Sequence, residues 1–156
     1  MITYPVSLEE IGLAVISATK EFNKYKNAWR KNDAHLENFF FGKIGEIGYS
    51  KHTGQPFNFE FYTNKGDGGA DIGSAQVKTV TWDKENKTIK VDKNSNSFTN
   101  ESVDKFVLMF LDPKLGGTEV NIIGEISKTN FKKKSKPSEK YPNLLVLDEK
   151  DLDIHY

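Results

Sequence analysis

Residues 66–79 read GDGGADIGSAQVKT, a glycine-rich connection that leads into an alternating run, and this stretch decides the fold. Gly73 and Ser74 suit the two central positions of a type II′ hairpin turn, because glycine supplies the positive φ that the first position requires. A turn there would pair Ile72 with Ala75. The stretch therefore predicts a tight hairpin whose second arm is a strand running from Ala75 to Trp82.

Three polar side chains of this hairpin are expected on one face. Asp71 would stand opposite Gln76, and directly opposed residues hold their Cβ atoms about 4.5–5.5 Å apart. Lys78 follows Gln76 by two residues and so points to the same side. Magnesium prefers oxygen ligands and takes one or two carboxylates, while an ammonium group can orient a water or stabilise charge developing on phosphorus. The group indicates phosphodiester hydrolysis assisted by a divalent cation.

Upstream of the hairpin, the sequence predicts two helices. The first runs from Ser7 to about Ala28, with Ser7 and Glu10 forming a capping box. The second begins at Asn32 or Asp33 and ends near Ser50. The first helix should bury one apolar stripe at steps of three and four residues, comprising Leu8, Ile11, Val15, Ala18, Phe22, Tyr25 and Trp29.

The second helix carries the candidate for a further carboxylate. Gly42, Gly45 and Gly48 recur within it, although each glycine costs about 1 kcal/mol in a helix relative to alanine. Their spacing predicts that another part of the chain packs very close to that face. Glu46 lies among these glycines, and we expect it to complete the acidic site.

Downstream, the pattern changes to strands. Residues 57–62 alternate between phenylalanine and polar residues or tyrosine, and continuous apolar runs predict strands buried on both faces. These runs are Phe106–Leu111 and Val120–Ile126, and Leu144–Leu147 is a third, shorter apolar run. Residues 88–91 also predict a strand, with a weaker pattern. Helices followed mostly by strands indicate an α/β or α+β domain around a mixed sheet. Residues 92–101 are expected to form a polar loop.

Glu46, Asp71 and the run from Gln76 to Lys78 together resemble the motif of the PD-(D/E)XK nuclease superfamily, whose fold is restriction-endonuclease-like or Holliday-junction-resolvase-like. The resemblance covers roughly residues 39–82 and continues through the later strands to about residue 131. It implies a single domain over 1–156, an α/β fold with a mixed central sheet flanked by helices, and helices first. It also implies that Glu46 and Asp71 bind Mg²⁺ or Mn²⁺, that Gln76 assists them, and that Lys78 is the catalytic lysine.

The sequence departs from the family pattern in three ways. Ala70 stands where the name-giving proline would be. Gln76 replaces the more usual acid, which weakens metal binding. The gap between Asp71 and Gln76 is short, and the Gly-Ser turn gives that gap a geometric reason.

Composition excludes several other classes of protein. There are 22 Lys and Arg against 22 Asp and Glu, so binding driven by net charge alone is excluded. The absence of cysteine excludes a disulfide framework, a zinc ribbon and a thiol nucleophile. No apolar run approaches the roughly 18 residues that a bilayer span needs, and the start of the sequence lacks signal-peptide features. These features lead us to expect a cytoplasmic protein without a membrane partner.

Positive charge is concentrated locally in residues 128–140, either as a solvated loop or as a surface that contacts phosphates. The candidates for nucleic-acid contacts are Lys51, His52, Thr79, Lys132, Lys133, Lys134 and Lys136. Arg30 is the only arginine beside 21 lysines. Since bidentate readout of guanine usually relies on arginine, we expect recognition through the backbone and the shape of DNA.

The sequence thus favours a metal-dependent DNA endonuclease, which the family resemblance implies would act as a homodimer. RNA is an alternative substrate, because the chemistry at phosphorus is shared. The other alternative is a catalytically inactive relative that binds DNA or a protein partner.

Overall fold

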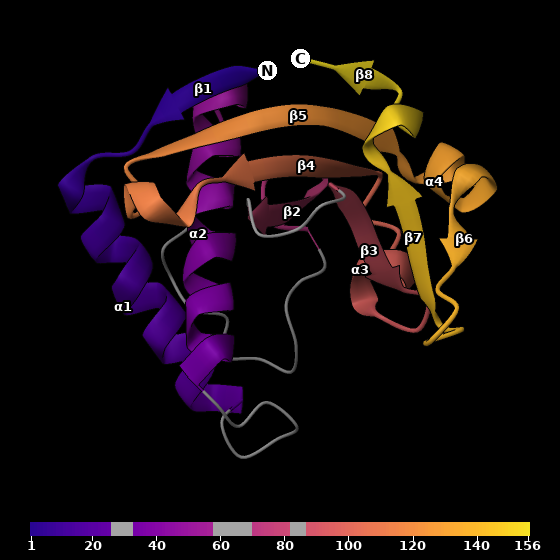
Figure 1. The fold of residues 1–156 in the computed structure, drawn as a ribbon, viewed down its shortest axis with the longest axis horizontal. Coiled ribbons are helices and arrows are strands. Elements are labelled where there is room, and N and C mark those ends of the chain that lie inside the picture. The colour runs from indigo at the N-terminus through magenta and orange to yellow at the C-terminus, as the bar shows by residue number, and fades with distance from the viewer. Residues whose placement is uncertain (26–32, 58–69, 82–86) are drawn as a thin grey trace.

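A computed structural model describes residues 1–25, 33–57, 70–81 and 87–156 (Figure 1). The expected end of the first helix beyond Tyr25, most of the alternating segment after Phe57, and Trp82 lie outside the described residues.

The described residues form four α-helices and eight strands. The helices are α1 (Leu8–Tyr25), α2 (Asp33–Thr53), α3 (Asn96–Thr99) and α4 (Lys128–Lys134). The strands are β1 (Ile2–Pro5), β2 (Ala75–Thr81), β3 (Thr88–Asp92), β4 (Lys105–Leu111), β5 (Glu119–Ser127), β6 (Lys136–Pro137), β7 (Leu144–Asp148) and β8 (Ile154–His155). All five strands expected downstream of residue 70 are therefore present, within one residue at each end.

The larger sheet is mixed, as predicted. Its order is β1-β5-β4-β2, and β8 pairs with β5. β2 runs parallel to β4, whereas β4, β1 and β8 are antiparallel to β5. The apolar strands β4 and β5 are central, and their side chains are largely buried. A second, antiparallel sheet has the order β3-β7-β6.

Hydrophobic cores cover both faces of the larger sheet. On one face, Ile44 and Ile47 of α2 pack in a cluster with Val77 of β2. On the other face, Val80 of β2 joins Ile89 of β3 in a separate cluster. Since side chains alternate along a strand, β2 presents its odd-numbered residues to α2 and its even-numbered residues to the second sheet.

The buried face of α1 differs from the predicted stripe. Ala18 is fully buried as predicted, and Ala14, outside the predicted stripe, is also fully buried, whereas Leu8 and Val15 are 83% and 47% exposed. The expectation that Leu8 and Val15 pack in the core was wrong. The small alanines lie on the side where α1 meets α2, because two helix backbones approach most closely there.

Five further elements were not expected from the sequence: β1, α3, α4 and the two-residue strands β6 and β8. β1 precedes the helices, so the prediction that helices come first was wrong. α3 occupies part of the segment predicted to be a polar loop. α4 occupies the start of the lysine-rich segment, where the Ser127 hydroxyl accepts from the Asn130 N–H (3.2 Å) and Phe131 is buried. Among the described residues, no helix combines the length and apolar character that crossing a membrane requires.

Candidate active site

The predicted hairpin turn is present at Gly73 and Ser74. Gly73 has φ = 59°, and the φ of Ser74 is not positive, which fits a type II′ turn and excludes type I′. Ile72 and Ala75 form the expected antiparallel bridge, and the Ala75 N–H donates to the Ile72 carbonyl (2.9 Å). The turn holds Asp71 against the start of β2.

The carboxylate of Asp71 is fixed by two donors at one oxygen. Its Oδ2 accepts from the Val77 backbone N–H (2.7 Å) and from Gln76 Nε2 (2.5 Å). The N–H groups of Asp71 and Ile72 both donate to the Ala75 carbonyl (2.8 and 3.2 Å). The antiparallel pairing between the two arms of the hairpin therefore ends after the Ile72–Ala75 bridge. Beyond it, the Asp71 side chain, rather than a backbone carbonyl, accepts the hydrogen bond from the Val77 N–H. The expected proximity of Asp71 and Gln76 is confirmed.

Gln76 is 7% exposed, and its Oε1 is buried with no hydrogen-bond partner among the described residues. The orientation of the amide follows from its neighbour, because reversing it would set Oε1 against the Asp71 carboxylate. A buried carbonyl oxygen without a donor costs free energy. An oxygen of this kind beside a carboxylate is a suitable ligand for a hard cation.

Glu46 faces the same hairpin from α2. Gly45 packs against Thr79 so closely that a Cβ at position 45 would overlap the Thr79 hydroxyl. This close approach brings the helix backbone up to β2. Burial raises the pKa of Glu46 to about 8, and the negative charge of Asp71 contributes to the increase. The two predicted acids therefore interact, as a shared site requires.

Lys43 and Glu21 also belong to this acidic site, although neither was predicted from the sequence. Lys43 Nζ lies 3.2 Å from Glu21 and 3.5 Å from Glu46. Although burial opposes it, the charges of Glu46 and Glu21 raise the pKa of Lys43, with a smaller contribution from Asp71. The three-residue spacing from Lys43 to Glu46 was a signal available in the sequence. Glu21 comes from α1, and only the packing of the helices reveals it.

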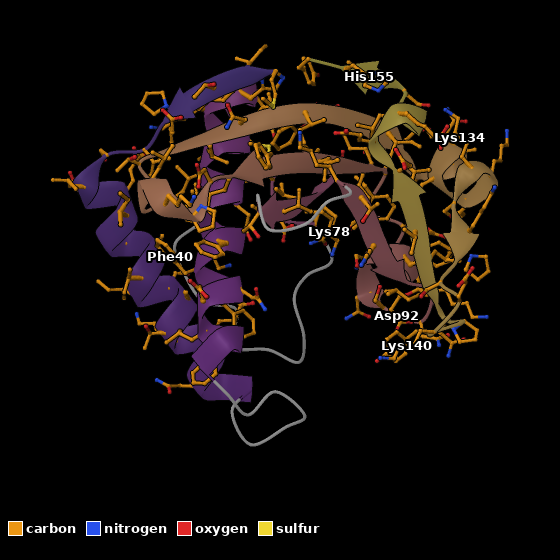
Figure 2. All side chains as sticks on the ribbon, viewed as in Figure 1. Phe40, Lys78, Asp92, Lys134, Lys140 and His155 are labelled. Atoms are coloured by element: carbon orange, nitrogen blue, oxygen red, sulfur yellow. The ribbon has the colours of Figure 1, made fainter. Side chains whose placement is uncertain are left out.

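Lys78 shares with Gln76 the face of β2 that is turned away from α2. The alternation of the strand places it with Gln76 and Val80, toward the second sheet, and Figure 2 shows it in the region between α2 and β3. It lines a pocket of about 140 Å³ together with Thr79, Val80, Thr88 and Lys90. Asp71 thus contacts Gln76 and also interacts electrostatically with Glu46 of α2, while Lys78 follows Gln76 by two residues on the same face of β2.

Three predicted nucleic-acid contacts have structural roles in the fold. Lys51 Nζ donates to Glu10 Oε1 and to the Pro5 carbonyl, both at 2.6 Å. His52 Nδ1 shares a hydrogen bond with the Tyr4 hydroxyl (2.7 Å). The Thr79 hydroxyl is buried beneath α2, so it is not exposed to a phosphate.

The lysines predicted after residue 128 lie mainly on α4. Lys132 Nζ is 4.8 Å from the centre of the Phe98 ring, and Lys134 pairs with Asp153 at 3.0 Å. Lys133 and Lys136 are exposed. Figure 2 shows Lys134 and Lys78 on opposite sides of β7, so this surface is separate from the hairpin site.

The donor set suits magnesium better than zinc. Across residues 1–25, 33–57, 70–81 and 87–156, no group of three or more His, Asp or Glu side chains is arranged to hold a metal ion. The available ligands are two carboxylates and the Gln76 amide oxygen. Magnesium keeps several waters and needs one or two carboxylates, so these residues fit it.

No protein-family model, curated protein or solved structure matches this chain. The likeness to the PD-(D/E)XK nucleases therefore rests on the quoted residues, and the fold that the structure shows is mixed α/β.

Proposed function

We propose that the protein is a Mg²⁺- or Mn²⁺-dependent DNA endonuclease of restriction-endonuclease-like fold. One observation carries the proposal: the buried Gln76 Oε1, without a hydrogen-bond partner among the described residues, lies beside the Asp71 carboxylate, and Glu46 interacts with that carboxylate from α2. Two acids and an amide oxygen in a partly buried site are oxygen ligands of the kind these cations prefer.

In this proposal each residue has a defined role. Glu46, Asp71 and Gln76 would hold the cation, which supplies charge to the scissile phosphate and lowers the pKa of a bound water. Gln76 Nε2 and the Val77 N–H keep the Asp71 carboxylate in place. Lys78 would stabilise the charge that develops on the phosphate oxygens and orient the attacking water.

A second candidate function, nucleic-acid binding without cleavage, is favoured by Lys43. Its ammonium group already neutralises part of the acidic site, at 3.2 Å from Glu21 and 3.5 Å from Glu46. If Lys43 keeps this position when DNA binds, the carboxylates would not recruit a metal. Binding to a protein partner, also kept open by the sequence, has no observation in its favour.

The test compares wild-type protein with Asp71→Asn, Glu46→Gln and Lys78→Met on supercoiled plasmid, linear duplex, branched DNA and RNA, in Mg²⁺, Mn²⁺ or EDTA. Asp71→Asn is the informative change, because an amide oxygen at the Oδ2 position can still accept from both Val77 and Gln76. We expect metal-dependent cutting of DNA in the wild type and its loss in all three variants.

Lys114→Ala is the matched control, because Lys114 is exposed and lies in the β4–β5 connection. Cleavage of RNA alone would reassign the substrate. Binding of DNA without cleavage in any metal would support the second candidate. A gel-filtration mass measurement with and without duplex would test the proposed homodimer.

A further inference from the structure

The pocket beside Lys78 carries lysine side chains from two strands that are distant in sequence, together with the Thr88 hydroxyl. Lys78 and Thr79 come from β2, and Thr88 and Lys90 come from β3. Its volume of about 140 Å³ corresponds to several water molecules at about 30 Å³ each. A phosphate group fits a space of this size.

The chemistry of the lining indicates an anionic ligand. Of the described residues that line this pocket, two are lysines and none carries a carboxylate. A second pocket, of about 390 Å³, is lined by Asp104, Glu125 and Asp153 beside one lysine, and would repel a phosphate. Lysine acts as a point-charge ligand for phosphate, and threonine supplies a hydroxyl donor.

The fold fixes Lys90 in this position. Ile89 and Val91 are buried in the core between the sheets, so the alternation of β3 turns Thr88 and Lys90 to the other side. β3 is further held by its pairing with β7, in which Lys90 stands opposite Val146. The backbone of Lys90 is therefore rigidly placed, while its exposed side chain remains available to solvent.

We propose that this pocket binds a backbone phosphate of the cleaved DNA strand and that Lys90 is a substrate-positioning residue. The inference rests on the proposed endonuclease function and extends its site from β2 to the second sheet. Lys90 and the Thr88 hydroxyl hold the phosphate in the ground state, which places the strand against Lys78 and the acidic site. A contact that is equally strong in the ground state and in the transition state lowers KM and leaves kcat nearly unchanged.

The experiment measures binding of a fluorescent DNA duplex in EDTA across a range of salt concentrations, for wild type, Lys90→Ala, Lys90→Arg and the control Lys114→Ala. Each phosphate contact contributes a slope of about 0.9 to the dependence of log K on log salt for duplex DNA. Lys90→Ala should reduce the slope by about 0.9 and weaken binding several-fold. Lys90→Arg should retain both values, and Lys114→Ala should match the wild type.

Cleavage kinetics give the second measurement. Lys90→Ala should raise KM several-fold with kcat nearly unchanged. The proposal is overturned if Lys90→Ala has the wild-type salt slope, or if kcat falls while KM stays constant. If the wild type cuts no substrate, the proposed function fails, while the binding series in EDTA still decides whether the pocket holds a phosphate. Thr88→Val provides an independent variant, expected to weaken binding, should Lys90→Ala not fold.

Discussion

Replacing Gly45 by alanine tests the close approach of α2 to β2 on which the candidate site depends. A Cβ at this position would overlap Thr79 Oγ1 and would lie 3.1 Å from Thr79 Cβ and 3.4 Å from Thr79 Cγ2. Gly42, one turn earlier in the same helix, has nothing within 4 Å of an added Cβ. Gly42→Ala is therefore a control with the same chemical change and no obstruction.

The two substitutions should have opposite effects on the free energy of unfolding. Alanine is better than glycine in a helix by up to about 1 kcal/mol, and Gly42→Ala should gain most of this. Overpacking a core typically costs about 1–3 kcal/mol. After subtracting the helix gain of up to about 1 kcal/mol, Gly45→Ala should be destabilising by up to about 2 kcal/mol. The two variants should therefore differ by about 1–3 kcal/mol, or roughly 2–12 °C in Tm.

Urea unfolding followed by circular dichroism measures these differences, and Thr79→Ala completes a double-mutant cycle. Removing the Thr79 hydroxyl and methyl should recover most of the stability that Gly45→Ala loses, with a coupling energy of about 1 kcal/mol or more. Stability of Gly45→Ala equal to that of Gly42→Ala, or additive effects in the cycle, would refute the close contact.

Three other predictions concern charged groups. Between pH 4.5 and about 8, folded Glu46 keeps a proton that the unfolded chain has released, so wild-type stability in EDTA should fall relative to Glu46→Gln as the pH rises through this window; parallel urea-unfolding curves would contradict this. Lys43→Met removes the cation beside Glu21 and Glu46, so its unfolding midpoint in EDTA should fall, and added Mg²⁺ should stabilise it more than the wild type. Against the effect of burial, hydrogen bonds lower the pKa of Asp153 from 3.8 to about 2. The wild type should therefore be more stable than Asp153→Asn above pH 3.8, and thermal melts should show this advantage disappearing as the pH falls toward 2.

The parts of the site that follow from local geometry were predictable from the sequence. Gly73 and Ser74 define a two-residue turn, and that turn alone determines which residues oppose each other. The contact between Asp71 and Gln76 therefore could be predicted without knowing the rest of the fold. The glycines of α2 correctly predicted close packing at Gly45, although Gly42 has no such neighbour.

The parts that depend on packing between distant elements could not be predicted. Glu21 pairs with Lys43 because α1 packs on α2. Lys90 lines the same pocket as Lys78 because β3 lies near β2 in the fold. The prediction of the buried face of α1 was partly wrong, because more than one apolar stripe fits the sequence of this helix. Packing against α2 selects a stripe that includes Ala14. Such contacts depend on how distant elements pack together, and the hydrophobic periodicity of a single element does not predict that packing.

The arrangement of the larger sheet has a consequence for the order in which the chain folds. β4 and β5 are antiparallel neighbours joined by a short connection, so their pairing closes a small loop, whereas the parallel pairing of β2 with β4 must first enclose β3 and α3. Contacts between residues far apart in sequence form slowly, because the chain loses the entropy of loop closure before these contacts stabilise it. We expect the β4–β5 hairpin to belong to the folding nucleus and β2 to join late. Amide protons of β2 should then exchange with solvent sooner than those of β4 and β5, which would make the candidate site the most easily opened part of the larger sheet's core.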